Sequence, residues 1–405
     1  MTNATEESKI RVDPRRVDAV VLVGGKGTRL RPLTLSAPKP MLPTAGVPFL
    51  THLLARIAAT GIEHVVLGTS YKAETFEEEF GDGSNLGLQI DYVVESEPLG
   101  TGGGIANVAS KLRNDTVMIF NGDVLSGADL GAMLNKHHDC EAEVTLHLVR
   151  VSDPRAFGSV PTDADGNVLA FLEKTEDPPT DQINAGTYIF KRSVIDQIPR
   201  GREVSVEREV FPALLSGGAK VCGYVDMSYW RDMGTPEDFV RGSADLVRGI
   251  APSPALGGKR GESLVHDGAS VAPGALLYGG TVVGRGAEIG AEMIRRAVSL
   301  AFRLEGDTVT RLPGCVLDDR SRNLSGSCHS WALIRLLFVD CVLVICQAIQ
   351  RHSSVASPLA YGRYESSHST GSRRRAVSCG WDGCSEPLSP LACPRTSSCR
   401  RTSWP

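Results

Sequence analysis

Short runs of apolar β-forming residues alternate with segments of helical periodicity in the first third of the chain. The strand pattern recurs in residues 17–23, 62–69, 88–94 and 116–120. Apolar residues at helical spacing occupy residues 49–60, 71–80 and 100–112. Strands that alternate with helices in this way predict a parallel α/β sheet with helices packed on it.

The pattern becomes richer in strands after a helical segment at residues 128–138. Strands are predicted over residues 143–151, 168–173 and 187–190, with a turn at 163–167. Helical spacing returns at residues 207–215 and 236–247. A Pro/Gly-rich linker follows at 249–262, and residues 1–16 are polar and charged. We therefore expect a flexible N-terminus at 1–16 and one domain over 17–248 that ends at the linker.

Past the linker, aliphatic residues recur at every sixth position. The five positions in register are Val265, Val271, Leu277, Val283 and Ile289. Small residues and glycines fill many of the intervening positions, which is typical of a β-helix whose aliphatic side chains stack inside it. The alternative is a Gly-rich loop with chance spacing. The sequence predicts a short, truncated left-handed β-helix over residues 263–293.

The six-residue period fails after this segment, and the composition changes with it. From residue 301 onward the chain holds 13 arginines, no lysine and eight of its ten cysteines. A β-helix that simply stops would expose apolar stack and open strand edges. We expect residues 294–405 to be an anomalous, disordered tail, and we hypothesise that it is read in a shifted frame. Further hexapeptides should appear when one or two bases are restored in the gene near codon 293.

The first apolar run ends abruptly at a glycine-rich turn, which is the main candidate for chemistry. Gly24, Gly25 and Gly27 are followed by Thr28 and Arg29, and Lys39 lies ten residues beyond Arg29. Glycine lets the backbone approach a ligand closely, and successive amides form an anion-binding concavity. The alternative is a tight turn with a solvated basic face, because Gly-rich patterns have false positives.

Two acidic residues lie where a strand gives way to a helix or turn. Asp123 ends the Asn121-Gly122-Asp123 segment that follows the buried strand at 116–120, and Asp232 precedes Gly234-Thr235-Pro236. Carboxylate oxygens suit Mg²⁺, a hard ion usually shared with substrate phosphates. The alternative for a lone Asp after a strand is a helix N-cap or an Asx turn.

Three further places offer polar groups beside turns. Gly100 and Thr101 belong to a second Gly-rich turn, which could support a planar base and offer amides to it, or could simply start a helix flexibly. Glu173 and Lys174 end a strand and could bind a sugar phosphate, although exposed charge pairs are common. Asn184 precedes a strand and could bind a hydroxyl or close a turn.

Taken together and in this order, the motifs resemble those of the sugar-1-phosphate nucleotidyltransferases. The segments are GGKGTRLRPLT, PKPM, EPLGTGG, NGDV, FGSV, FLEK, NAGTYIF, SVEREVFP and YWRDMGTPEDF, which cover residues 17–248. This resemblance implies a Rossmann-like mixed sheet, with NTP and hexose 1-phosphate as substrates and Mg²⁺ as cofactor. It assigns catalysis to Arg29, Lys39 and Lys174, nucleotide binding to Gly24, Gly25, Gly27, Thr28, Gly100 and Thr101, sugar-phosphate binding to Gly158, Glu173 and Asn184, and the metal to Asp123 and Asp232.

Within that family, the hexapeptide extension and SVEREVFP make the pattern similar to the mannose-1-phosphate guanylyltransferases. Glucose-1-phosphate thymidylyl- or uridylyltransferases are an alternative, because base and sugar choice depend on pocket shape. A paralogue that binds sugar nucleotides without turnover is a second alternative, and a defective gene product with an intact front half is a third.

The overall charge and the N-terminus limit the partners and the location. The formal net charge of −4 argues against a general nucleic-acid binder, so the basic turn is a local site. The N-terminal segment has no apolar stretch of the kind found in secretory signals. We expect a cytoplasmic enzyme that binds neither nucleic acid nor membrane and that forms a homo-oligomer.

Overall fold

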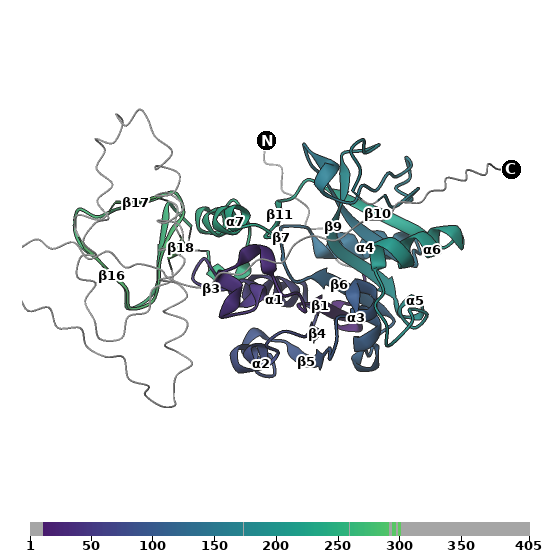
Figure 1. The fold of residues 1–405 in the computed structure, drawn as a ribbon, viewed down its shortest axis with the longest axis horizontal. Coiled ribbons are helices and arrows are strands. Elements are labelled where there is room, and N and C mark those ends of the chain that lie inside the picture. The colour runs from purple at the N-terminus through teal and green to yellow at the C-terminus, as the bar shows by residue number, and fades with distance from the viewer. Residues whose placement is uncertain (1–10, 173, 259, 291–293, 297–298, 301–405) are drawn as a thin grey trace, which may run out of the picture. The chain divides into compact units, whose positions relative to one another are not determined.

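The computed structural model describes residues 11–172, 174–258, 260–290, 294–296 and 299–300. Its main feature is a seven-stranded sheet in the order β10-β8-β9-β6-β1-β4-β5 (Figure 1). In chain order the strands are β1 (Val17–Leu22), β4 (His64–Thr69), β5 (Gln89–Val94), β6 (Thr116–Asn121), β8 (Val144–Arg150), β9 (Gln182–Lys191) and β10 (Val221–Asp226).

The sheet is mixed, as the family resemblance implied. Strands β6, β1, β4 and β5 are parallel neighbours, and β10 runs parallel to β8. Strand β9 lies antiparallel between β6 and β8, with a register shift opposite Leu146 and Leu148. The carboxyl ends of the four parallel strands therefore meet at one edge, where ligands bind in open α/β sheets.

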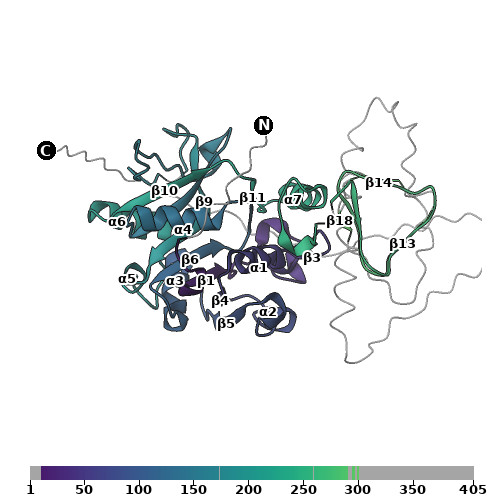
Figure 2. The ribbon, with the colours of Figure 1, turned by 180° about the vertical axis from the view of Figure 1, so that it is seen from behind.

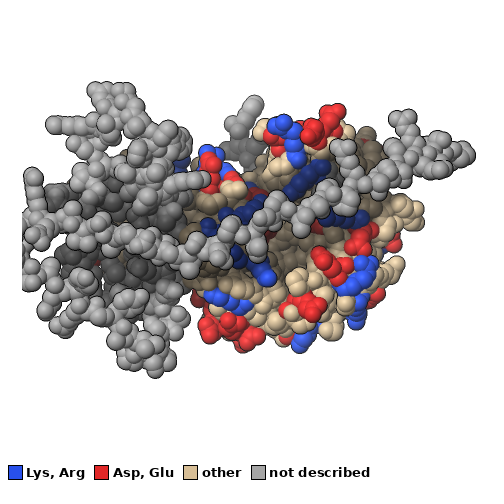
Figure 3. Space-filling view, viewed as in Figure 1, with Lys and Arg blue, Asp and Glu red and all other residues tan. Residues whose placement is uncertain are grey.

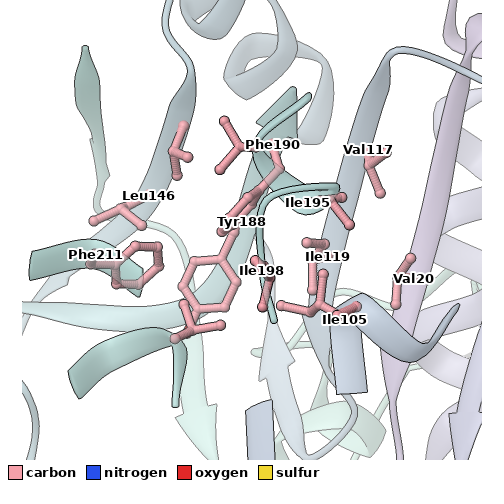
Figure 4. Close-up of a cluster of buried hydrophobic side chains, with 14 of the residues drawn as sticks. Val20, Ile105, Val117, Ile119, Leu146, Tyr188, Phe190, Ile195, Ile198 and Phe211 are labelled. Carbon is pink, nitrogen blue, oxygen red and sulfur yellow. The ribbon is translucent and has the colours of Figure 1, made fainter. Parts of the chain in front are cut away.

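Helices cover both faces of the sheet. On one face, the core includes side chains from α3 (Gly100–Val108), α5 (Arg192–Ile195) and α6 (Phe211–Ser216) (Figure 4). On the other face, α1 (Phe49–Thr60), α2 (Glu74–Phe80) and α4 (Leu130–Asp139) supply the core, and α4 lies against β8 and β10 (Figure 2). Strand β1 alternates between the two, because Val20 joins the first core while Ala19 and Val21 join the second.

Most predicted elements are found, and one is wrong. Helix α1 has the predicted bounds, ended by Gly61 in a left-handed conformation with φ of 92°. The strand predicted at 168–173 is absent among the described residues there, which make only isolated bridges such as Thr162–Val168 and Ser159–Leu172. The helix predicted at 207–215 starts as a π-helical turn, Val206–Val210, before α6.

Two short strand pairs and the last helix complete the domain. Strand β7 (Val124–Ser126) pairs with β11 (Trp230–Asp232), and β2 (Pro43–Thr44) pairs with β3 (Val47–Pro48). Helix α7 (Pro236–Arg248) begins with Thr235 as its N-cap and Pro236 at its first position. Single 3-10 turns lie at Pro14–Arg16, Thr28–Leu30, Leu33–Leu35, Lys39–Met41, Ser84–Leu86, Ala109–Lys111, Pro154–Ala156 and Pro254–Leu256.

The hexapeptide segment forms short parallel strand pairs. Partners lie 18 residues apart in three of these pairs, such as Leu264 and Val282, and 17 residues apart in the pair that joins Val283 to Leu300. The strands are β12 (Ser263–Val265), β13 (Ser270–Val271), β14 (Leu276–Tyr278), β15 (Thr281–Val283), β16 (Glu288–Ile289), β17 (Ile294–Arg296) and β18 (Ser299–Leu300). In order, β12 pairs with β15, β13 with β16, β14 with β17 and β15 with β18.

Four of the five predicted stacking positions share one apolar cluster, namely Val271, Leu277, Val283 and Ile289. Val265 does not, because its side chain is 38% exposed, and Leu264 is buried instead in a cluster with residues of α7. The prediction that Val265 points into the stack is therefore wrong.

Two expectations about the chain ends concern residues that the structure barely describes. Residues 1–10 lie outside the described part, and of the predicted tail at 294–405 only 294–296 and 299–300 are described. No helix in the described ranges combines the length and apolar character needed to cross a membrane.

Candidate active site

The carboxyl edge of the parallel strands gathers the predicted glycine turn and several polar residues. Gly24 follows β1, Ser70 follows β4 and Glu95 follows β5. The Ser70 hydroxyl donates to the Gly24 carbonyl, and the Glu95 N–H donates to the Thr69 carbonyl at 2.7 Å. The strand ladder thus continues one residue beyond its formal ends and fixes where the turn after β1 begins.

The turn from Gly24 to Arg29 combines one constrained position with an open one. Gly27 has φ of 56°, and a Cβ built on it would lie 2.9 Å from the Thr34 Cγ2 and 3.1 Å from the Lys39 Cβ. The Thr34 hydroxyl donates to the Gly27 carbonyl at 2.9 Å. A Cβ on Gly25 would meet no atom within 4 Å, so backbone at this position is open to a ligand.

The two candidate metal ligands are brought together by one strand pair. In the antiparallel pair of β7 and β11, Asp232 lies opposite Val124, the residue after Asp123. The Met233 N–H donates to the Asp123 carbonyl at 3.1 Å, which extends the pairing past the carboxylates. Sequence alone placed each acid at a junction; the pairing of β7 with β11 makes them neighbours.

Lys39 lies between the two carboxylates. Its Nζ is 2.8 Å from Asp123 Oδ2 and 3.8 Å from Asp232 Oδ1, and its side chain is only 8% exposed. The 3-10 turn Lys39–Met41 holds the lysine backbone, and Pro40 occupies its second position. The positive charge of Lys39 partly compensates the two carboxylates beside it. A bound anion or cation would change this compensation and with it the pairing of the three groups.

The electrostatics of Asp232 show how crowded this site is. Burial raises the pKa of Asp232, and the Asp123 carboxylate raises it further, against the opposing effect of Lys39 and Arg29. The Oδ1 atom of Asp232 is buried without a hydrogen-bond partner. A Cβ on Gly234 would lie 3.0 Å from the Arg29 Nη2 and 3.0 Å from the Asp232 Oδ2, so the guanidinium and this carboxylate both lie beside Gly234.

The second Gly-rich turn packs against a neighbouring segment. Gly100 has φ of 68°, and a Cβ on it would lie 2.6 Å from the Val204 carbonyl oxygen. That oxygen accepts the N–H groups of Gly102 and Gly103 at 2.8 and 3.2 Å. The two amides are therefore engaged inside the protein rather than open to a base, and glycine is needed here for close backbone packing.

Glu95 is a candidate site residue that the sequence alone did not indicate. A Cβ on Gly24 would lie 3.5 Å from its Oε2, and one on Gly104 would lie 2.8 Å from its Oε1. Its carboxylate thus lies between the two Gly-rich turns. Burial raises the pKa of Glu95, partly offset by a hydrogen bond from the Leu99 backbone. Its position just after β5 was the available signal, because residues after parallel strands share one edge.

The predicted sugar-phosphate residues are partly described. The Asn184 N–H donates to the Gly158 carbonyl at 3.0 Å, so these two residues are neighbours. The Asn184 side chain donates to the Tyr188 hydroxyl at 2.8 Å and accepts from the Gly186 N–H at 3.0 Å. Lys174 is exposed, and Glu173 lies outside the described residues.

The assembled groups suit a polyanion and a hard cation. Lys39 joins Asp123 and Asp232, Arg29 and Asp232 both lie beside Gly234, and Lys39 packs against Gly27 of the glycine turn. On the charge-coloured surface, lysine and arginine side chains gather in a band across the middle of the face shown (Figure 3). Within the described ranges no cluster of three or more His, Cys, Asp or Glu residues could hold a metal alone. A cation here would take further oxygens from a ligand or water.

Comparison with known proteins gives consistent matches. The nucleotidyl transferase family profile matches residues 18–249. A mannose-1-phosphate guanylyltransferase of Mycobacterium tuberculosis is 75% identical over 308 residues, which cover 75% of this chain and 83% of the relative.

Two solved structures match the α/β domain. HddC from Yersinia pseudotuberculosis, crystallised with GMP-PN, is 30% identical with a TM-score of 0.50, covering 56% of this chain and 97% of HddC. A putative glucose-1-phosphate thymidylyltransferase from Bacillus anthracis is 20% identical with a TM-score of 0.52. The match covers 56% of this chain and 94% of that protein, and at this identity it shows a similar fold.

Proposed function

Because this chain belongs to the nucleotidyl transferase family, we propose that it transfers the guanylyl group of GTP to mannose 1-phosphate, forming GDP-mannose and pyrophosphate. The family membership confirms the resemblance drawn from the motifs, and the chain is a nucleotidyltransferase. The observation that carries the proposal is the cluster of Arg29, Lys39, Asp123 and Asp232, which touches the glycine turn where Lys39 packs against Gly27. We choose GTP and mannose 1-phosphate as the substrates because the 75% identical relative is a mannose-1-phosphate guanylyltransferase.

The reaction needs positioning and charge stabilisation more than a strong base. A phosphate oxygen of the sugar phosphate attacks the α-phosphorus of GTP, a new P–O bond forms, and the bond to the β-phosphate oxygen breaks in line. The nucleophile is already an anion, so the protein must bring two polyanions together and stabilise developing charge. Arg29 and Lys39 would stabilise the developing charge on the triphosphate. Gly24, Gly25, Gly27 and Thr28 would bind that triphosphate.

Asp123 and Asp232 would hold Mg²⁺. The donor set fits, because both ligands are carboxylates and Asp232 Oδ1 is buried without a hydrogen-bond partner. When bound, the ion would polarise phosphoryl oxygens and neutralise their charge. The raised pKa of Asp232 fits a group whose charged form is unfavourable until a cation joins it.

Glu95 favours guanine among the four bases. A carboxylate accepts hydrogen bonds only, and guanine presents two adjacent donors, N1–H and the N2 amino group, on one edge. Uracil and thymine present a single N–H flanked by carbonyls, which a carboxylate repels. Gly100 and Thr101 would support the base from the N-terminal end of α3.

Replacing Glu95 with glutamine should lower the preference for GTP over UTP about 10- to 100-fold. The reason is that one guanine N–H would then face the glutamine NH2 group, a donor, in place of a carboxylate oxygen. Ratios of kcat/KM for the two nucleotides measure this. Glu97→Gln is the matched control, since Glu97 is an exposed acid two residues away. An unchanged ratio in Glu95→Gln would remove this residue from base selection.

The sugar phosphate would bind at Gly158, Glu173, Lys174 and Asn184, where Lys174 pairs with the phosphate. We expect Lys174→Ala to raise KM for mannose 1-phosphate about tenfold or more with a smaller change in KM for GTP, since it loses a charge-assisted contact. Lys220→Ala, at another exposed lysine, serves as control. An unchanged KM for the sugar phosphate would count against this role.

Pyrophosphate release tests the whole proposal. The full chain is assayed with GTP, ATP, UTP and dTTP, each with mannose 1-phosphate or glucose 1-phosphate. Highest kcat/KM for GTP with mannose 1-phosphate is the expected result. Preference for UTP or dTTP with glucose 1-phosphate would support the thymidylyl- or uridylyltransferase alternative. Nucleotide binding without any release would identify a non-catalytic paralogue.

We also propose that the domain spans residues 17–248, with a linker at 249–262 and the start of a left-handed β-helix after it. Support comes from parallel strand partners 18 residues apart and from the apolar cluster containing Val271, Leu277, Val283 and Ile289. We further propose that the enzyme is a cytoplasmic homo-oligomer without nucleic-acid or membrane partners. Light scattering of the purified chain tests the oligomeric state.

A further inference from the structure

Glu207, in the segment SVEREVFP, sits between the two predicted halves of the site. Its Oε2 accepts a hydrogen bond from the Thr101 hydroxyl at 2.8 Å and another from the Ser205 hydroxyl at 2.9 Å. Its Oε1 accepts a longer one from the Tyr188 hydroxyl at 3.5 Å. Thr101 belongs to the nucleotide side, and Tyr188 bonds Asn184 of the sugar side.

The hydrogen-bond directions require a carboxylate at this position. The Val206 N–H donates to the Thr101 hydroxyl oxygen at 2.9 Å, and the Asn184 amide donates to the Tyr188 hydroxyl oxygen at 2.8 Å. Each hydroxyl therefore directs its own hydrogen toward Glu207. Ionised glutamate is acceptor-only, whereas glutamine would place two donor hydrogens against one of these hydroxyls.

The surrounding structure fixes all three side chains. Glu207 belongs to the π-helical turn Val206–Val210, a rare geometry that occurs often at functional sites. Tyr188 is 1% exposed, and its ring packs against Phe211 with centroids 5.4 Å apart (Figure 4). The Tyr188 hydroxyl also bonds the side chain of Asn121, two residues before Asp123.

We propose that Glu207 is a positioning residue that couples the nucleotide side to the sugar-phosphate side of the site. This inference rests on the proposed function. Thr101 and Tyr188 both donate to the Glu207 carboxylate. When bound nucleotide fixes the position of the Thr101 side chain, Glu207 therefore also fixes the Tyr188 hydroxyl, which in turn positions the Asn184 side chain. Binding of either substrate then favours the geometry that binds the other.

Calorimetry with Glu207→Gln, Tyr188→Phe and the control Glu209→Gln tests this. Glu209 lies in the same turn and bonds Arg202 and the Ser205 N–H, but makes no contact with Thr101 or Tyr188 among the described hydrogen bonds. A non-hydrolysable GTP analogue and mannose 1-phosphate are titrated separately and then each in the presence of the other, with Mg²⁺ present.

We expect Glu207→Gln to weaken both ligands about tenfold and to reduce the mutual enhancement of binding to about one. Tyr188→Phe should weaken mannose 1-phosphate several-fold, leave the GTP analogue alone near the wild-type affinity, and also reduce the mutual enhancement of binding to about one, because it removes the link between Glu207 and Asn184. Glu209→Gln should match the wild type. Because Tyr188→Phe removes only a hydroxyl, it decides the question if Glu207→Gln does not fold.

Three results would overturn the coupling role: wild-type enhancement in Glu207→Gln, unchanged sugar-phosphate affinity in Tyr188→Phe, or equal losses in Glu209→Gln. Any of them leaves the proposed function standing as long as the wild type releases pyrophosphate. If the wild type binds neither ligand, the proposed function fails instead.

Discussion

Replacing Asp123 with asparagine is expected to lower kcat about a thousandfold, which corresponds to roughly 4 kcal/mol of lost transition-state stabilisation. The carboxylate would hold the metal and pair with Lys39, whose Nζ lies 2.8 Å from it. Asparagine keeps the shape and removes the charge. Steady-state pyrophosphate release at saturating Mg²⁺ measures the loss.

The fold of this variant should persist, because the Asp123 side chain is 40% exposed and the buried ammonium of Lys39 keeps Asp232 as a second carboxylate 3.8 Å away. We expect the free energy of unfolding in urea to stay within about 1 kcal/mol of the wild type. Asp139→Asn is a matched control, since its side chain is 45% exposed and pairs with Arg11. A folded Asp123→Asn protein with near-normal kcat would refute the metal role.

Much of this site could be predicted from sequence where strong local patterns occur. The glycine turn follows a strand whose residues are almost all buried, so its place at a sheet edge follows from the pattern. Helix α1 has apolar residues at helical spacing and a glycine stop, and its predicted and observed bounds agree. Asp123 could be predicted as a candidate for the same reason, because it lies two residues after the end of the buried strand β6.

Long-range contacts could not be predicted in this way. Asp232 meets Asp123 only because β11 pairs with β7 across more than a hundred residues, which no local pattern encodes. The strand expected at 168–173 fails because its neighbours offer only isolated bridges. Val265 fits the six-residue period yet is exposed, since α7 and its neighbours bury Leu264 on the opposite side of the strand.

The same reasoning explains why Glu95 and Glu207 were missed. Glu95 becomes informative only when the glycines of two separate turns approach it, and Glu207 only when the π-helical turn directs it toward Thr101. Acids are common on surfaces, so their sequence pattern alone carries little information. The fold identifies them by placing both carboxylates against groups from distant segments.

Replacing Lys39 with methionine is expected to lower kcat/KM about a hundredfold, because it removes the ammonium that lies between two carboxylates and that would stabilise the triphosphate in the proposed reaction. Methionine preserves the buried aliphatic stem, so packing against Gly27 should change little. Lys111→Met, at a lysine whose side chain is 48% exposed, is the control. Near-normal kcat/KM would place Lys39 outside the reaction.

The same variant should lose stability in a pH-dependent way. Burial and Asp123 already raise the pKa of Asp232, and Lys39 opposes them, so removing Lys39 should raise that pKa further. A carboxyl whose pKa is raised on folding binds more protons when folded, so the stability it costs grows as pH rises above the unfolded value. We expect Lys39→Met to be destabilised by about 2 kcal/mol near pH 7 and by much less near pH 4, because the partly exposed carboxylates soften the cost of a broken buried pair. Urea unfolding at both pH values without added metal measures this. An equal loss at both would mean that packing rather than charge accounts for the effect.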